Sequence, residues 1–147
     1  AILFLLSTVV LAKPVIKADD TYFDVSTGLY VLTGNVYIEA NNRVITAGQA
    51  KVNPVSMEVW GSGGITVTQD DIYFTGDTVH VYGSQEKAEI DGGVTLARNG
   101  LKIIADRVTY MWRDRLAVFT GNVQITQDDK SWTADSVNYN METNSFQ

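Results

Sequence analysis

The sequence contains no cysteine, only two prolines and a single histidine among 147 residues. Without cysteine, neither a disulfide framework nor a thiolate metal site is available. Eleven Lys and Arg stand against seventeen Asp and Glu, and the net charge of −6 argues against a nucleic-acid surface, which needs clustered basic residues. The basic residues are scattered singly along the chain, so we expect them to be solvated loop charges.

What the sequence does contain is a repeat with a period of 29 residues. Gly34, Gly63, Gly92 and Gly121 are each 29 positions apart, and an aliphatic residue follows each of them two positions later. A fixed period of this length is typical of arrays in which every unit buries its apolar face against its neighbours. The array extends over residues 16–147, which corresponds to about 4.5 units.

Each unit alternates apolar and polar residues with the period of a β-strand. Val36 and Ile38 share one face of the strand that follows the first glycine, while Tyr37 and Glu39 share the other. In the second strand of each unit the apolar residues change parity at one column, and this change predicts a bulge or a corner there. The column contains Gly48, Asp77, Asp106 and Asp135.

Turn signals divide every unit into two hairpins. One set of turns contains Asn41-Asn42 and its equivalents, and the other contains Asn53-Pro54 and its equivalents. Short turns between strands of seven to ten residues favour antiparallel neighbours over a parallel β-helix. We therefore predict an all-β fold, a repeat-built antiparallel β-jellyroll in which two sheets face each other as a folded-over array. The large side chains of Trp60, Phe74, Phe119 and Trp132 are candidates to fill or line the space between these sheets.

The first twelve residues differ from the rest of the chain. Residues 1–12 are apolar and uncharged, and Lys13-Pro14 follows them. This segment resembles the hydrophobic region of a signal peptide, with Val10 and Ala12 at the positions that precede cleavage. Because about 20 apolar residues are needed to span a bilayer, the segment is short for a membrane helix. We expect an exported protein whose first twelve residues are a signal peptide or a membrane-proximal apolar segment.

Two short segments carry a resemblance to a known family. Thr33-Gly34-Asn35-Val36 and Thr120-Gly121-Asn122-Val123 lie three periods apart, and each is followed by a strand, a turn and a segment such as Ile103–Tyr110. Together they resemble the OstA-type repeat of the LptA family over residues 16–147. The chain departs from the pattern where Gly48 replaces Asp and where Gly63-Gly64 and Gly92-Gly93 replace Gly-Asn.

The resemblance implies a periplasmic carrier that bridges the inner and outer membranes and holds the acyl chains of lipopolysaccharide in an apolar groove between its sheets. It also implies partners, namely other OstA-fold transport proteins joined by edge-strand pairing, and a head-to-tail homo-oligomer. No polar cap follows the last unit, which is consistent with such pairing. The predicted groove residues are Leu32, Val36, Ile38, Ile45, Ile65, Val67, Phe74, Ile90, Val94, Leu96, Ile103, Phe119, Val123, Ile125 and Trp132.

Two alternatives stay open at this point. A retained apolar N-terminus would favour a component anchored in the inner membrane and similar to LptC. A purely structural β-repeat assembly domain would need the same edges but no groove, because inward aliphatic residues in a β-array are packing residues first. Lipid binding distinguishes this structural role from that of a carrier.

An enzyme is the remaining class, and the sequence offers little for it. No G-x-S-x-G, H-E-x-x-H or phosphate-loop pattern occurs. Asp70-Asp71 and Asp128-Asp129 occupy equivalent turn positions in two units, which favours turn chemistry over a catalytic carboxylate pair. His80 stands in a polar column, so we expect it at the surface. We predict no enzymatic activity, no metal site and no cofactor.

Overall fold

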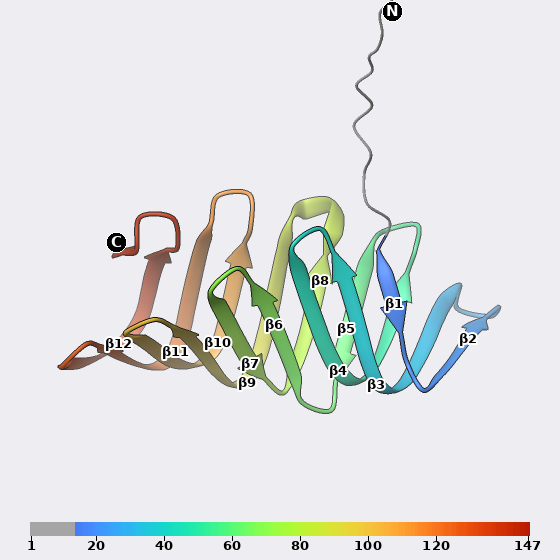
Figure 1. The fold of residues 1–147 in the computed structure, drawn as a ribbon, viewed down its shortest axis with the longest axis horizontal. Coiled ribbons are helices and arrows are strands. Elements are labelled where there is room, and N and C mark those ends of the chain that lie inside the picture. The colour runs from blue at the N-terminus through green and yellow to red at the C-terminus, as the bar shows by residue number, and fades with distance from the viewer. Residues whose placement is uncertain (1–13) are drawn as a thin grey trace, which may run out of the picture.

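The computed structural model describes residues 14–147, so the predicted signal-peptide segment 1–12 lies outside the described residues. Antiparallel strands account for most of the described chain (Figure 1). No helix within this range has the length and hydropathy of a membrane span. The strands are β1 (Val15–Lys17), β2 (Asp20–Asp24), β3 (Leu29–Ala40), β4 (Arg43–Asn53), β5 (Glu58–Ser62), β6 (Ile65–Gln69), β7 (Ile72–Gly76), β8 (Thr78–Tyr82), β9 (Lys87–Arg98), β10 (Leu101–Met111), β11 (Leu116–Gln127), β12 (Lys130–Asn140) and β13 (Ser145–Phe146).

Hydrogen bonds join all the strands into one antiparallel network that is folded over into two layers. The order is β1-β3-β4-β5-β8-β9-β10-β11-β12-β13, while β2 pairs with β3, β6 pairs with β4 and β7, and β7 pairs with β9. Long strands such as β10 bend near their middle, so that each contributes one half to either layer. We call the layer that contains β2, β5 and β8 sheet I, and the layer that contains β1, β6 and β7 sheet II. The predicted antiparallel β-jellyroll is thereby confirmed.

The bends coincide with the glycine and aspartate columns of the repeat. The strand register shifts between Thr120 and Val123 on β11 and between Ile104 and Arg107 on β10. Gly121 adopts a φ of +85°, and a Cβ on it would lie 2.5 Å from a carboxylate oxygen of Asp106. Only glycine combines this conformation with such a close approach. The side-chain amide of Asn122 donates to the same carboxylate at 2.9 Å, which completes the corner.

The same corner is built in other units. The carboxylate of Asp19 lies against Gly34 and accepts a hydrogen bond from Asn35, and Asp77 lies against Gly92. Where Gly48 replaces the aspartate, it packs directly against the backbone of Gly63. The predicted parity change therefore marks the place where each strand passes from one sheet into the other.

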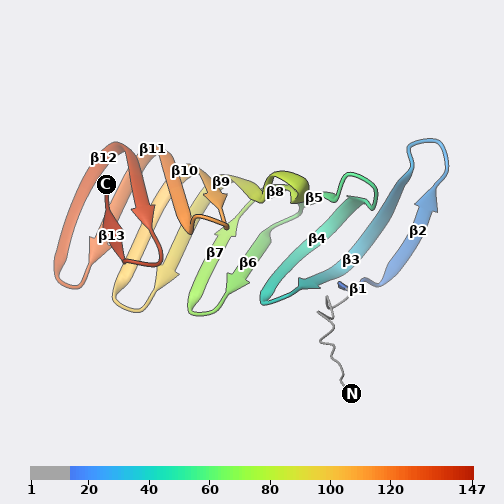
Figure 2. The same cartoon turned by 90° about the horizontal axis from the view of Figure 1, so that it is seen from above.

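The core lies between the two sheets and follows the predicted alternation. Val36 and Ile38 on β3 are buried, and Tyr37 between them is partly exposed. In Figure 1 the sheet I turns that follow β8, β10 and β12 lie along the upper side of the molecule, whereas the sheet II turn between β11 and β12 lies at its lower left end. Figure 2, from above, shows the turns of sheet II along the lower margin, while the turns of sheet I run from the upper right, after β2, toward that margin at the C-terminal end. We call the gap between these two rows of turns the mouth.

Candidate functional site

One continuous row of apolar side chains crosses the inner face of sheet II from its first strand to its last. Each residue of the row is the register partner of the next on the neighbouring strand, so their side chains lie side by side. The row consists of Ile16, Ile38, Ile45, Val67, Phe74, Leu96, Ile103, Ile125 and Trp132. It contains eight of the fifteen predicted groove residues, and it gives the space between the sheets an uninterrupted apolar floor.

The structure packs most of the predicted groove residues tightly. Thirteen of the fifteen are buried, and Val94, Leu96, Ile103, Phe119 and Val123 are each 0% exposed. Such side chains are part of a filled core, because protein interiors leave few voids larger than a water molecule. The two that are not buried lie toward opposite ends of the row: Ile45 is half-buried, and Trp132 on β12 is 39% exposed.

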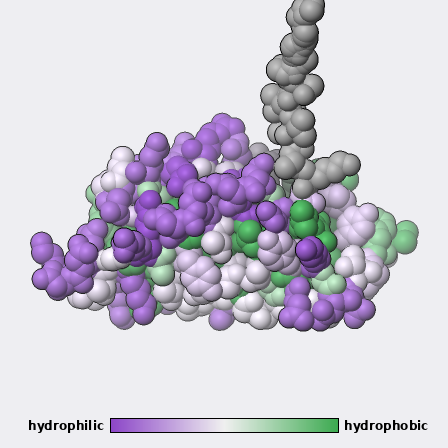
Figure 3. All heavy atoms as spheres, viewed as in Figure 1, coloured by the Kyte–Doolittle hydropathy of each residue, from purple (hydrophilic) through white to green (hydrophobic). Residues whose placement is uncertain are grey.

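The N-terminal end of the inter-sheet space is more open than the remainder. Eight of the ten exposed large apolar residues lie between positions 15 and 57, and of these Ile16, Phe23 and Tyr30 occupy inner-face positions. Phe23 and Tyr30 pair across β2 and β3 on the inner face of sheet I, with ring centroids 4.9 Å apart, and they are 47% and 41% exposed. Figure 3 shows apolar atoms at the surface near β1 and β2, whereas polar atoms cover much of the opposite end. We call this part of the molecule the open end.

A row of polar contacts closes the mouth along the rest of the array. The hydroxyl of Tyr110 in sheet I donates to Gln69 Oε1 at the edge of sheet II, at 3.0 Å. Arg98 of sheet II donates to the hydroxyl of Tyr139 in sheet I at 3.0 Å and to the carbonyl of Met141 in the turn that follows β12. These two bridges are related by the 29-residue period. We call this row of contacts the seam.

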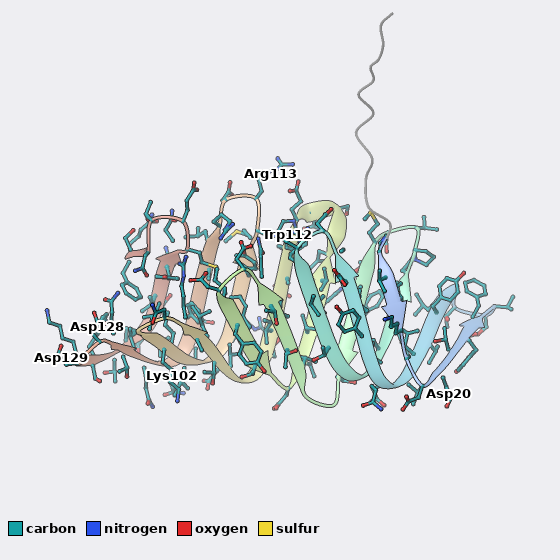
Figure 4. The ribbon with its side chains drawn as sticks, in the orientation of Figure 1. Asp20, Lys102, Trp112, Arg113, Asp128 and Asp129 are labelled. Atoms are coloured by element: carbon teal, nitrogen blue, oxygen red, sulfur yellow. The ribbon has the colours of Figure 1, made fainter. Side chains whose placement is uncertain are left out.

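Two further contacts belong to the seam. The guanidinium of Arg43, at the start of β4, lies 4.8 Å from the centroid of the Trp112 ring. Arg115, in a sheet I turn, lies 3.7 Å from the carboxylate of Asp70 in a sheet II turn. Figure 4 shows Trp112 at the upper side beside the mouth, while Arg113 next to it points away into solvent. The seam therefore holds the turns of the two sheets together through side chains.

The seam corrects our interpretation of the basic residues as scattered solvated charges. The Arg98 side chain is only 18% exposed and that of Arg115 only 27%, because the fold carries both over the packed core. A signal for the seam is present in the sequence. Tyr110 and Tyr139 share one column of the repeat, and polar Gln69 and Arg98 share another, next to the turns. The missing information was that these two columns meet across the mouth.

The contribution of the seam to the stability of the fold depends on pH through Asp71. The hydrogen bond from Arg98, at 3.0 Å, holds the pKa of Asp71 below its usual value. A carboxylate with a lowered pKa stabilises the fold above its unfolded pKa, about 3.9, and loses this contribution as the pH falls through the folded pKa. We expect Asp71→Asn to reduce the unfolding free energy at pH 7 by about 0.2–1 kcal/mol, since Asp71 is half exposed. In urea unfolding the difference between the two proteins should shrink as the pH is lowered from 7 toward about 2. A difference that persists undiminished in acid would contradict this.

The outer face of sheet I contains an aromatic cluster that the sequence analysis placed differently. Trp60 was a candidate for the space between the sheets, but it alternates with the inward residues Val59 and Gly61 and lies on the outer face. His80 stacks between Trp60 and Tyr82, with centroid distances of 5.0 and 3.8 Å, and is hydrogen-bonded to Glu58 at 2.9 Å. His80 is thus partly buried on an outer face, where aromatic neighbours hold its ring.

A hollow of about 710 Å³ lies on this outer face. Its side-chain walls include Val31, Lys51, Trp60 and His80, which all point away from the core. None of the predicted groove residues except Leu32 borders it, and the Leu32 side chain is buried in the core. This hollow is therefore separated from the inter-sheet space by sheet I.

Residues 14–147 contain no group of three or more His, Cys, Asp or Glu placed to hold a metal ion. Asp70 and Asp71 lie in one exposed turn, and Asp128 and Asp129 lie in another, as Figure 4 shows for the second pair. Asp70 and Asp71 form ion pairs with the arginines of the seam. The inter-sheet space thus combines a continuous apolar row, an open end with exposed inner-face side chains, and a seam of polar contacts along the rest of the mouth.

Comparison with known proteins gave two findings. Residues 45–145 match the family model described as LptA/(LptD N-terminal domain) LPS transport protein. The fold is similar to the crystal structure of LptH from Pseudomonas aeruginosa, described as the LptA homologous periplasmic component of the lipopolysaccharide transport device, with a TM-score of 0.62 and 15% sequence identity. The alignment covers 67% of this chain and 76% of LptH. A search of curated protein sequences returned no match.

Proposed function

We propose that this chain, which belongs to the LptA/(LptD N-terminal domain) family of LPS transport proteins, is a periplasmic lipopolysaccharide carrier without enzymatic activity. The observation that supports this most directly is the uninterrupted apolar row between the sheets, which starts at the open end and reaches Trp132 on β12. Acyl chains of a glycolipid would lie along this row. Each methylene that they bury contributes about 0.8 kcal/mol to binding.

The open end is the proposed point of entry for the acyl chains. The inner-face residues Phe23, Tyr30 and Ile45 have surface that an apolar chain can cover without displacing packed side chains. Deeper positions such as Leu96 and Phe119 are filled by side chains, so an acyl chain reaches them only if the sheets move apart. The bends and the seam are then the two elements that resist this movement.

The edge strands support the proposed partners. Along residues 130–137 of β12, one side of the strand has no ladder partner among the described residues, and β2 pairs only with β3. Unpaired backbone of this kind can accept a further strand. We propose that other OstA-fold transport proteins, or further copies of this chain, pair with these edges and extend the apolar row from one membrane to the other.

Photo-crosslinking to lipopolysaccharide tests the carrier function. A photoreactive residue at Ile45 or Leu96 should form lipid adducts, because both side chains face the inter-sheet space. The matched controls are Thr46 and Thr95, the next residues outward on the same strands, which should form none. We expect more adduct at Ile45, which is half-buried, than at fully buried Leu96. Absence of adducts at every position in a folded protein would return the array to a structural role.

A further inference from the structure

Three arginines of the seam, Arg43, Arg98 and Arg115, lie in the same part of the mouth as Tyr110. Burial raises the pKa of Tyr110, and the nearby charges of Arg115, Arg43 and Arg98 act in the opposite direction. Their positions agree with this: Arg43 is the register partner of Gln69, which accepts the hydrogen bond from Tyr110, and Arg115 and Arg98 contact the next two residues, Asp70 and Asp71. The three arginines come from different elements, namely β4, β9 and the turn after β10.

These arginines are not fully matched by acidic partners. The carboxylates that pair with them are Asp70 and Asp71, so three positive charges meet two negative ones in a chain whose net charge is −6. The guanidinium of Arg98 already donates hydrogen bonds to Asp71, Tyr139 and Met141. Arg43 forms no ion pair among residues 14–147, and its guanidinium lies against the Trp112 ring.

Arg115 has the clearest unused capacity for hydrogen bonding. Its Nε is buried and has no hydrogen-bond partner, and its contact with Asp70 is long, at 3.7 Å. A buried donor without a partner is uncommon, because leaving it unsatisfied costs free energy that a ligand can restore. A planar guanidinium with free donors matches the oxygen atoms of a phosphate, which it can contact through two hydrogen bonds.

The cluster lies directly above the apolar row. The ring of Tyr110 lies 5.5 Å from that of Phe74, which is a member of the row and 1% exposed. Positive charge at the mouth and apolar side chains beneath it match a molecule with an anionic head and apolar tails. We propose that Arg43 and Arg115 bind a phosphate group of a phosphorylated glycolipid at the mouth, while Arg98 supplies positive charge and holds the sheets together. This inference rests on the proposed carrier function.

The test compares two forms of one lipid, phosphorylated lipid A and the same lipid treated with phosphatase. Binding of each is measured for the wild type, for the double variant Arg43→Gln/Arg115→Gln, and for Arg107→Gln. Arg107 is the matched control, because it pairs with Asp91 on the outer face. We expect the double variant to lose on the order of tenfold in affinity for the phosphorylated lipid and little for the treated lipid. Arg107→Gln should change neither affinity.

A second variant guards against a general loss of structure. Arg43→Lys/Arg115→Lys keeps both charges and should recover part of the preference for the phosphorylated lipid, with a thermal unfolding midpoint close to that of the wild type. Equal loss for both lipids, or no loss for either, overturns the inference but leaves the carrier function intact. Binding of inorganic phosphate alone that depends on Arg43 and Arg115, without any preference between the lipids, assigns the cluster to free phosphate and also overturns it. If the wild type binds neither lipid, the carrier function itself fails, and the inference fails with it.

Discussion

Replacement of Phe119 by alanine is expected to lower the unfolding free energy by about 3–5 kcal/mol. Phe119 is 0% exposed and lies between Val108 and Val137 in the register of sheet I. Removal of its ring leaves a cavity that the surrounding strands can fill only in part, since their backbones are held by ladder hydrogen bonds. Chemical denaturation followed by tryptophan fluorescence measures the loss.

Phe23→Ala is the matched control for Phe119→Ala. Phe23 is also an inner-face phenylalanine of sheet I, but it is 47% exposed at the open end. Its loss should reduce the unfolding free energy by less than about 1.5 kcal/mol, because less apolar surface is exposed by the change. If Phe23 lies at the point of entry, Phe23→Ala should weaken lipid binding while leaving most of the stability. Equal destabilisation by both substitutions would contradict the distinction between a packed interior and an open end.

Gly121→Ala should have the second large effect, through the corner of β11. The substitution meets two obstacles, a φ of +85° and the carboxylate of Asp106 at 2.5 Å from the new Cβ. The left-handed conformation alone costs a non-glycine residue about 1–2 kcal/mol. The steric overlap adds about 1–3 kcal/mol, since Asp106 can move only by giving up its hydrogen bond from Asn122. The unfolding free energy of the variant measures the sum.

Gly64 allows the two causes to be separated. Its φ is +82°, but a Cβ there would have no heavy atom within 4 Å. Gly64→Ala should therefore show only the conformational cost of about 1–2 kcal/mol. In an Asp106→Gly background, the additional cost of Gly121→Ala should fall to the same value, because the overlapping carboxylate and the Cβ of Asp106, at 2.8 Å from the new Cβ, are both gone. An unchanged cost in that background would show that the bend does not depend on the contact between Asp106 and Gly121.

The bends and the seam have complementary consequences for a carrier. Corners such as that of Asp106 and Gly121 fix where each strand passes between the sheets, and the seam holds the opposite side at Arg98 and Tyr139. The corners occur along the whole array, including Asp19 and Gly34 near the open end, whereas the seam acts only along its more C-terminal part, where the interior is fully packed. The open end around Phe23 and Tyr30 lies outside this region. Acyl chains would then enter where the sheets are least constrained.

Much of the fold could be predicted because its determinants are local. Alternation along Val36 to Glu39 sets the inner and outer faces of a strand, and the parity change at Asp106 sets its bend. The prediction for Trp60 was wrong: its large side chain suggested a place between the sheets, but it lies on the outer face. The inward positions on either side of it are occupied by Val59 and the small Gly61. Side-chain volume alone does not determine which face a residue occupies.

The candidate site was predicted in part. The sequence identified the residues of the apolar row, but it did not show that Phe119 and Leu96 are fully packed while Ile45 is only half-buried. That difference depends on how far the two sheets are apart at each unit. The repeat pattern alone predicts the same burial for equivalent positions in every unit, so it does not reveal such differences.

The sequence by itself determined the repeating unit, the inner and outer faces, the bends and the family resemblance, because each depends on residues close together or one period apart. Only the tertiary structure decided which turns meet across the mouth. Tyr110 lies 41 residues after Gln69, and Tyr139 lies 41 residues after Arg98, a separation that is not a multiple of the repeat. It results from the twist of the two sheets, which places each turn of sheet II opposite a turn of sheet I from further along the chain. Because this twist accumulates over many strands, no short segment of the sequence encodes it.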